Sequence, residues 1–221
     1  MRLAPGRAKQ PDRDPRQMSI GVLALQGDFA EHLRVLQRLG AAGRPVRTAD
    51  QLTGLDALII PGGESTTIGK LATTFHILEP LRRFAADKPT WGTCAGAILL
   101  SRDARRDQPL LGVMDIVVER NAFGRQVDSF EIDLPIPALD DASRPFHAVF
   151  IRAPLIESVG KGVEVLAELP RDAGSQRPPA SNGSARIVAA RQGHLLATAF
   201  HPELTEDDRF HRFFLRMVKG P

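Results

Sequence analysis
The chain has 221 residues, of which 43% are hydrophobic and 25% are charged. This length favours a single domain with a substantial core, and no apolar run approaches the ~18 residues of a membrane-spanning helix. The single cysteine excludes an internal disulfide and a metal site made of several thiolates. Because the N-terminus also lacks the apolar segment of a secretory signal, we expect a cytoplasmic protein.

The net charge of +3 resides in the first 17 residues, where five lysines and arginines outnumber two aspartates. The rest of the chain is therefore formally neutral, and no basic groove with interleaved aromatic residues indicates nucleic-acid binding. Three prolines and few apolar side chains predict a disordered basic extension at 1–17. We expect residues 18–221 to form one domain, with Met18 as a candidate functional start.

The first half of the sequence alternates between strand and helix patterns. A nearly continuous apolar run at 19–26 predicts a strand buried on both faces, and a helix follows in which Asp28 and Glu31 have capping-box spacing. The pattern then predicts a weak strand at 45–49, a strong strand at 55–60, helices within 66–86 broken near Pro80, a strand at 90–93 and a buried helix at 95–101. This order favours a largely parallel sheet with helices on both faces.

The second half is richer in predicted strands. They are expected near 113–118, 129–134, 148–151 and 164–169. After them the sequence predicts a turn-rich surface loop at 170–185, a hairpin of 187–191 with 194–200, and a final amphipathic helix capped by Thr205 with Asp208.

Cys94 lies in Gly-Thr-Cys-Ala-Gly (92–96), the pattern of a nucleophile elbow with cysteine in place of serine. A strand that turns sharply into a helix places the thiol at a helix N-terminus, where unpaired amides favour the thiolate. The amide of Ala95 is then able to face a developing oxyanion. Taken alone, the motif fits a buried structural cysteine equally well.

A cysteine nucleophile needs a base, and six histidines are the candidates. The other five lie in predicted helices or strands or lack an acidic residue two positions away, whereas His201 follows an apolar strand and precedes Pro202 and Glu203. In an extended chain Glu203 points the same way as His201, about 6.6 Å along, and can bond one imidazole nitrogen. On its own, the His-Pro-Glu segment is more typical of a surface turn.

Pro61, Gly62 and Gly63 follow the strong strand at 55–60. Two glycines at this position serve as a turn, and they also let a backbone amide point into the crevice at the carboxyl edge of the sheet. A phosphate-binding loop is excluded because five residues separate Gly63 from Gly69 and a leucine follows the lysine where Ser or Thr is required.

The cysteine elbow, the Pro-Gly-Gly loop and the terminal His-x-Glu, in this order, resemble the class I (triad-type) glutamine amidotransferases. The blocks VLALQGDFAEH, PGGESTTIGKL, WGTCAGAILL, ERNAFGRQ, FIRAP and FHPELTEDDRFHRFF are similar to the glutaminase subunit of the pyridoxal 5′-phosphate synthase complex, the PdxT/SNO family. These blocks cover most of residues 19–216. The resemblance implies a flavodoxin-like α/β fold, a three-layer α/β/α sandwich around a central, largely parallel (mixed) sheet.

This resemblance also implies an activity. It is hydrolysis of L-glutamine to L-glutamate and ammonia through a cysteine thioester, with the ammonia delivered to a PdxS/SNZ-type synthase subunit that makes pyridoxal 5′-phosphate. Neither a metal nor an organic cofactor is implied for this half-reaction. The implied roles are Cys94 as nucleophile, His201 as general base and acid, Glu203 as the group orienting His201, the amides of Gly63 and Ala95 as oxyanion hole, and Gly63, Glu64, Ser65, Arg120, Ile151 and Arg152 as glutamine-binding positions.

Two other functions are open to the same sequence. One is a glutaminase of another synthase, or a related cysteine hydrolase of the same fold, and the PGGES and ERNAFGRQ blocks argue against it. The other is a non-catalytic partner-binding subunit, which the intact Cys94, His201 and Glu203 disfavour. For Arg120 and Arg152, surface ion pairing is the alternative to substrate binding.

Overall fold

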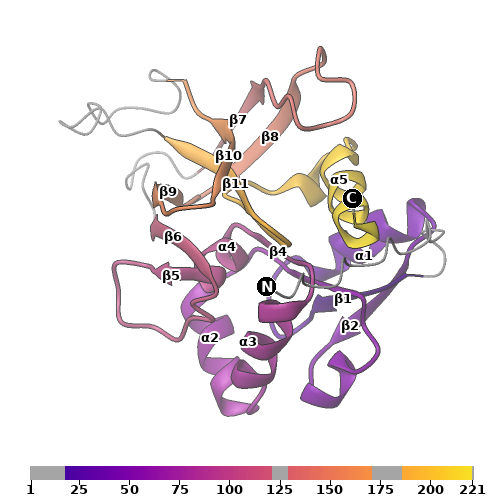
Figure 1. The fold of residues 1–221 in the computed structure, drawn as a ribbon, viewed down its shortest axis with the longest axis vertical. Coiled ribbons are helices and arrows are strands. Elements are labelled where there is room, and N and C mark those ends of the chain that lie inside the picture. The colour runs from indigo at the N-terminus through magenta and orange to yellow at the C-terminus, as the bar shows by residue number, and fades with distance from the viewer. Residues whose placement is uncertain (1–17, 121–128, 171–185, 221) are drawn as a thin grey trace, which may run out of the picture.

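The computed structural model (Figure 1) describes residues 18–120, 129–170 and 186–220. Three expected features fall outside these residues: the extension at 1–17, the ERNAFGRQ block beyond Arg120, and the loop at 170–185 beyond Pro170. None of the helices in the described ranges is long and apolar enough to cross a lipid bilayer.

Ten strands of the described residues form one mixed sheet, in which β2-β1-β3-β4-β12 are consecutive neighbours and run parallel. This half of the sheet confirms the predicted α/β class. Pro45 lies in the edge strand β2, where its missing amide costs no ladder hydrogen bond. The bounds are β1 Ser19–Leu23, β2 Ala42–Val46, β3 Ala57–Ile60, β4 Thr90–Thr93 and β12 Leu195–Thr198.

The other half of the sheet is mainly antiparallel. The predicted hairpin is present: β11 (Ile187–Gln192) pairs with β12 through a turn in which Gly193 has φ 57°. Beyond β11 the order continues β9-β6-β5, and β10 also pairs with β11. The bounds are β5 Ser101–Asp103, β6 Met114–Glu119, β9 Leu155–Val159 and β10 Glu164–Glu168. The sequence pattern missed β5 and β9 because β5 is short and polar and β9 is half exposed.

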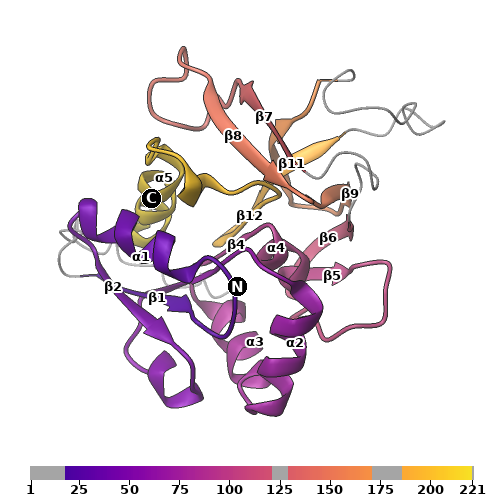
Figure 2. The same ribbon diagram turned by 180° about the vertical axis from the view of Figure 1, so that it is seen from behind.

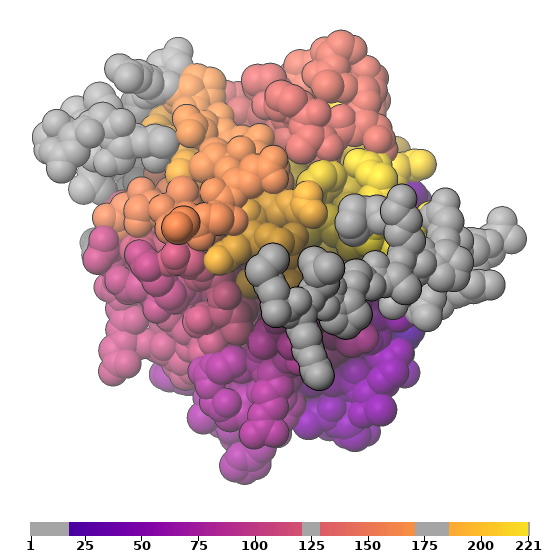
Figure 3. All heavy atoms as spheres, viewed as in Figure 1, coloured from indigo at the N-terminus to yellow at the C-terminus, as the bar shows by residue number. Residues whose placement is uncertain are grey.

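A separate two-stranded hairpin consists of β7 (Ser129–Leu134) and β8 (Phe146–Ile151), and it projects from the surface beside α5 (Arg209–Lys219) (Figure 3). Phe130 and Phe150 stack across it at 4.6 Å between ring centroids. Phe150 also contacts Phe200, which directly precedes His201. The hairpin is therefore anchored beside the chain segment that follows β12.

Helices cover both faces of the sheet, as Figure 2 shows from the reverse side. Side chains of α1 (Phe29–Arg38) and α5 pack in one core with Ala57 and Ile59 of β3. On the opposite face, Leu58 and Ile60 of the same strand pack with α2 (Ser65–Thr74), α3 (Leu78–Asp87) and α4 (Ala95–Leu100). This alternation confirms the three-layer arrangement, since successive residues of a strand point to opposite faces.

Two helix boundaries differ from the sequence prediction. The break between α2 and α3 falls at 75–77, where His76 has φ 55°, whereas Pro80 lies in the first turn of α3, which tolerates proline. The last helix begins at Arg209, and Thr205 instead follows a short 3-10 helix, η3 (Pro202–Leu204), which Pro202 initiates. A second 3-10 helix, η2 (Ala49–Leu52), follows β2.

Arg209 links α5 to the segment before β8. Its guanidinium donates hydrogen bonds to four backbone carbonyls of the 140–145 segment and to the carboxylate of Asp207, and its side chain is 5% exposed. Lysine has no planar fork of donors, so Arg209→Lys leaves several of these carbonyls unpaired. We expect this substitution to lower the free energy of unfolding by about 2–4 kcal/mol in urea titrations.

The matched control on the same helix is Arg212→Lys. Arg212 makes an i,i+4 ion pair with Asp208 and its side chain is 54% exposed. An exposed pair contributes about 0–1 kcal/mol, so this variant should remain close to wild type. Equal losses for the two variants would contradict the structural role assigned to Arg209.

Candidate active site
Three of the sequence motifs meet at the carboxyl edge of the parallel strands. The neighbours β3, β4 and β12 lead into the Pro-Gly-Gly loop, Cys94 and His201. Because these strands are parallel, their carboxyl ends lie at one edge, where open α/β sheets bind ligands. Segments that are distant in the chain are thus brought together.

Cys94 occupies a sharp turn between β4 and α4. Its backbone has φ 46° and ψ −104°, a conformation that costs a non-glycine residue about 1–3 kcal/mol. The Cys94 amide donates to the carbonyl of Thr198 at 2.8 Å, and the Cys94 carbonyl accepts from the amide of Ala97 at 3.1 Å. The buried cysteine therefore stands at the N-terminus of α4, as the elbow pattern predicts.

The two flanking glycines are required by close backbone contacts. A Cβ on Gly96 would lie 1.9 Å from the carbonyl oxygen of Ile60, and a Cβ on Gly92 would lie 2.4 Å from backbone atoms of Gly96. No side chain fits these spaces. Because both residues are glycines, β3, β4 and α4 can approach one another closely enough to form the sharp turn at Cys94.

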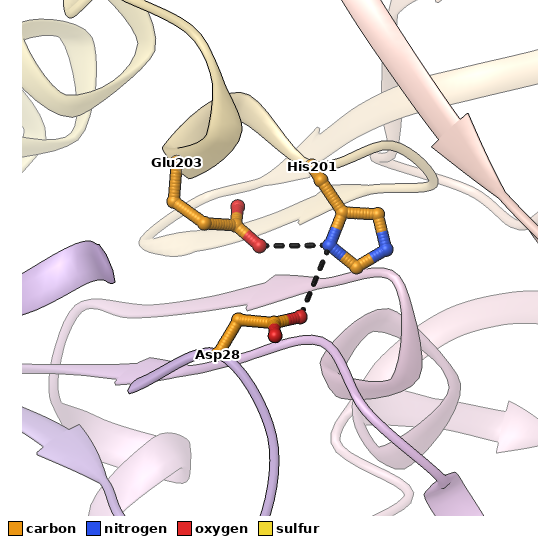
Figure 4. A group of neighbouring side chains, drawn as sticks. All are labelled: Asp28, His201 and Glu203. Atoms are coloured by element: carbon orange, nitrogen blue, oxygen red, sulfur yellow. Dashed lines mark hydrogen bonds and ion pairs between the residues drawn. The ribbon is translucent and has the colours of Figure 1, made fainter. Parts of the chain in front are cut away.

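His201 is held by two carboxylates (Figure 4). Its Nδ1 is 2.8 Å from Oε1 of Glu203 and 3.4 Å from Oδ2 of Asp28. Its backbone amide donates to the carbonyl of Val149 in β8 at 2.9 Å. Cys94 follows the strand next to the one that leads to His201 and contributes to the raised pKa of the imidazole, so the structure brings it beside the hydrogen-bonded pair of His201 and Glu203.

The network determines the charge of His201. Burial disfavours the imidazolium, but the contacts with Asp28 and Glu203 and the influence of the neighbouring Cys94 outweigh it and raise the pKa of His201 to about 12. Burial raises the pKa of Glu203, and the bond to His201 acts in the opposite direction. We conclude that the resting pair holds its proton on His201.

The ligand atoms of Asp28, His201 and Glu203 lie within 4.8 Å of one another, a spacing that a metal ion also requires. The Nδ1 atom that would bind such an ion already has Glu203 as its hydrogen-bond partner. The arrangement is therefore that of a histidine oriented by carboxylates.

The Pro-Gly-Gly loop lies directly against His201. A Cβ on Gly62 would be 2.3 Å from Cε1 of the imidazole, and Gly63 has φ 148°, a conformation that favours glycine. The side chain of Gln26, at the end of the first predicted strand, accepts a hydrogen bond from the amide of Glu64 at 2.8 Å. The loop is thus fixed between His201 and the segment that follows β1.

Glu64, Ser65 and Arg120 form a second cluster at this edge. Arg120 Nη2 donates to Glu64 Oε1 at 2.8 Å, and the hydroxyl of Ser65 and Arg120 Nη1 both contact Gln108 Oε1. Burial raises the pKa of Glu64, but hydrogen bonds from Thr67, Thr66 and Arg120 lower it to about 2. Glu64 is therefore a carboxylate at neutral pH, and it also caps the N-terminus of α2.

Ile151 and Arg152 lie at the end of β8, two and three residues after Val149. Ile151 is 39% exposed, and Arg152 has φ 43°. Among the described residues, no hydrogen bond or ion pair joins either side chain to Cys94, His201 or Glu64. The structure thus places these two predicted positions on the adjoining strand, outside the hydrogen-bonded network.

Sequence reasoning missed Asp28 and Gln26 as parts of the site. The capping-box prediction for Asp28 was wrong: it precedes α1, but its side chain makes no capping hydrogen bond and is directed to His201. Their position in the sequence could have identified them, because both follow a buried parallel strand next to β3 and residues at the carboxyl ends of such strands line ligand sites.

Comparison with known proteins gives strong matches along most of the chain. The model of the SNO glutamine amidotransferase family matches residues 22–220. The pyridoxal 5′-phosphate synthase subunit PdxT of Herpetosiphon aurantiacus is 58% identical over 203 residues, covering 90% of this chain and 99% of the relative. The protein of the same name in Acidothermus cellulolyticus is 55% identical over 212 residues, covering 94% and 96%.

Solved structures give a concordant result. A crystal structure of a glutamine amidotransferase is 50% identical, with a TM-score of 0.78 and coverage of 90% of this chain and 98% of that chain. The structure of PurLQS from Thermotoga maritima has a TM-score of 0.62 at 14% identity, covering 91% and 98%. The second likeness supports the fold alone.

The elbow makes a prediction about Gly96. Alanine in a helix is usually favoured over glycine by about 1 kcal/mol, but here its Cβ would collide with the carbonyl of Ile60. We expect Gly96→Ala to lower the free energy of unfolding by about 1–3 kcal/mol in urea titrations.

The matched helical control is Gly69→Ala in α2. Its Cβ would meet the Pro109 carbonyl at 2.9 Å, a milder contact than the 1.9 Å at Gly96. It should therefore lose less stability than Gly96→Ala. A Gly96→Ala protein as stable as wild type would show that the close approach is not needed.

Proposed function
Since the chain belongs to the SNO glutamine amidotransferase family, we propose that it is the glutaminase subunit of a pyridoxal 5′-phosphate synthase. In this function it hydrolyses L-glutamine to L-glutamate and ammonia and delivers the ammonia to the synthase subunit. The observation that carries the proposal is the convergence, at one sheet edge, of Cys94 at its helix N-terminus with the hydrogen-bonded pair of His201 and Glu203.

Cys94 is the nucleophile and His201 its acid and base in this proposal. The thiolate attacks the side-chain amide carbon of glutamine, forming an S–C bond. The C–N bond then breaks as His201 transfers its proton to the leaving nitrogen, which departs as ammonia and leaves a thioester. The raised pKa of His201 keeps this proton available at neutral pH.

Water completes the cycle. Neutral His201 takes a proton from a water molecule, whose oxygen attacks the thioester carbon, and the S–C bond breaks to release glutamate and restore the thiolate. Glu203 keeps Nδ1 of His201 engaged, so the opposite nitrogen performs both proton transfers. The amides of Gly63 and Ala95 are proposed to stabilise the oxyanion in both steps.

The cluster beside the elbow suits the α-amino acid end of glutamine. This end carries one carboxylate and one ammonium group, and Arg120 and Glu64 supply the opposite charges. In the structure these two residues pair with each other, so substrate binding exchanges one ion pair for two. Ser65, Gly63, Ile151 and Arg152 are proposed as the remaining contacts.

The proposal extends to the organisation of the chain. Residues 18–221 are proposed to form a single glutaminase domain, with 1–17 as a basic extension. The protein is proposed to act in the cytoplasm, and its proposed partner is a synthase of the PdxS/SNZ type. Its glutaminase reaction requires no resident cofactor in this scheme, because the thiol and the imidazole supply the chemistry.

The test of the nucleophile is glutamine hydrolysis by Cys94→Ala and Cys94→Ser with the synthase subunit present. Loss of the thiol should reduce kcat by at least about 10³-fold, because covalent catalysis depends on it. Cys94 is the only cysteine, so no second thiol can substitute. Retained turnover in Cys94→Ala would overturn the assignment.

A second test concerns the partner. We propose that the synthase subunit completes the oxyanion hole and expect its addition to increase kcat of the glutaminase, since an oxyanion-hole donor contributes about 10²–10³-fold. The measurement is ammonia release by the isolated chain and by the complex at saturating glutamine. An identical kcat in both preparations would contradict this expectation.

A further inference from the structure
A chain of buried polar side chains continues behind Glu203. Its Oε1 binds His201, while its Oε2 is buried and lacks a hydrogen bond within normal limits. Nε2 of His32 in α1 lies 3.4 Å from this Oε2, and both side chains are fully buried. A buried carboxylate oxygen without a donor is costly, so this contact requires an explanation.

His32 is in turn bonded to a second histidine. Its Nδ1 lies 2.9 Å from Nε2 of His211 in α5, and the two helices meet here from opposite ends of the chain. Trp91 packs edge-on against both rings, with centroids at 5.6 and 4.9 Å. Burial lowers the pKa of both histidines, that of His211 to about 3, so both rings are neutral.

Because both rings are neutral, two arrangements of their protons are possible in the network of Glu203, His32 and His211. In the first, His211 Nε2 donates to His32 Nδ1, and His32 Nε2–H faces Glu203 Oε2 and the hydroxyl oxygen of Thr93, 3.3 Å away. The unpartnered Nδ1 of His211 is then a bare acceptor. In the second, His32 presents a lone pair to the carboxylate, and His211 buries an unpaired N–H. The first is favoured, because it avoids both repulsion and an orphan donor.

We propose that His32 is a positioning residue for the reaction: its Nε2–H holds the free oxygen of Glu203, and His211 fixes the tautomer of His32. The proposal rests on the glutaminase function proposed above. It extends the network in the order His201, Glu203, His32, His211. The two helices on one face of the sheet thereby orient the imidazole beside Cys94.

The tautomers can be measured in the wild-type protein. NMR of the wild-type protein labelled with ¹⁵N-histidine should show His32 and His211 neutral at pH 7 and protonated on Nε2, with the His32 signals identified by their loss in His32→Gln. A His32 ring protonated on Nδ1, or on both nitrogens, would overturn the proposal. This measurement does not depend on glutaminase activity.

Kinetics of the complex provide the functional test. His32→Leu removes the donor to Glu203, and we expect kcat to fall about 10- to 100-fold with little change in KM, because His201 loses its fixed orientation. His32→Gln restores an amide N–H near the position of Nε2 and should recover most of this loss. A structural role alone would not predict that recovery.

The control is His194→Leu. His194 lies at the opposite end of β12, where its Nε2 contacts the carbonyl of Ala85, and its loss should leave kcat unchanged. Wild-type kcat in His32→Leu, with Cys94→Ala inactive, would refute the role of His32 and leave the proposed function intact. Turnover in Cys94→Ala would refute the assignment of the nucleophile, and absence of glutamine hydrolysis by the wild-type complex would refute the function itself.

Discussion
The parallel pairing of β4 with β12 is the constraint on which the site depends. The last register pair of these strands joins Thr93 to Thr198, and the Cys94 amide donates to the Thr198 carbonyl at 2.8 Å. One ladder of hydrogen bonds thus fixes the turn that carries the cysteine and the strand that leads to His201. The left-handed backbone of Cys94 is tolerated because the surrounding sheet and α4 determine it from both sides.

Next to these two strands the protein buries two ionisable side chains, which a core that served only stability would lack. Glu203 and His201 are almost fully inaccessible to solvent, and a buried ion pair contributes little to stability unless its remaining atoms are bonded. Asp28 supplies one additional contact to His201, and the proposed His32 donor supplies another to Glu203. The network therefore favours orientation of the imidazole over stability, a trade-off common at catalytic sites.

Local sequence signals predicted the parts of the fold that local geometry determines. GTCAG indicated the turn and the start of α4, and Gln192-Gly193 indicated the hairpin. Glycine is informative at such positions because it lacks a Cβ and so tolerates positive φ and close backbone contacts. The direction of Asp28 was not predictable, since capping-box spacing describes a helix terminus and not the imidazole across the sheet edge. His32 and His211 were assigned to helical faces because periodicity cannot identify which buried side chains from distant helices meet.

Cys94 is proposed to act as a thiolate nucleophile in a site that binds glutamine. A glutamine analogue with an electrophilic chloroketone in place of the side-chain amide tests it directly, because the adduct is stable and can be located by peptide mass spectrometry. We expect a single adduct on the peptide containing Cys94, formed more slowly when L-glutamine is present. An adduct that glutamine does not suppress, or the absence of modification at Cys94 in the complex, would contradict it.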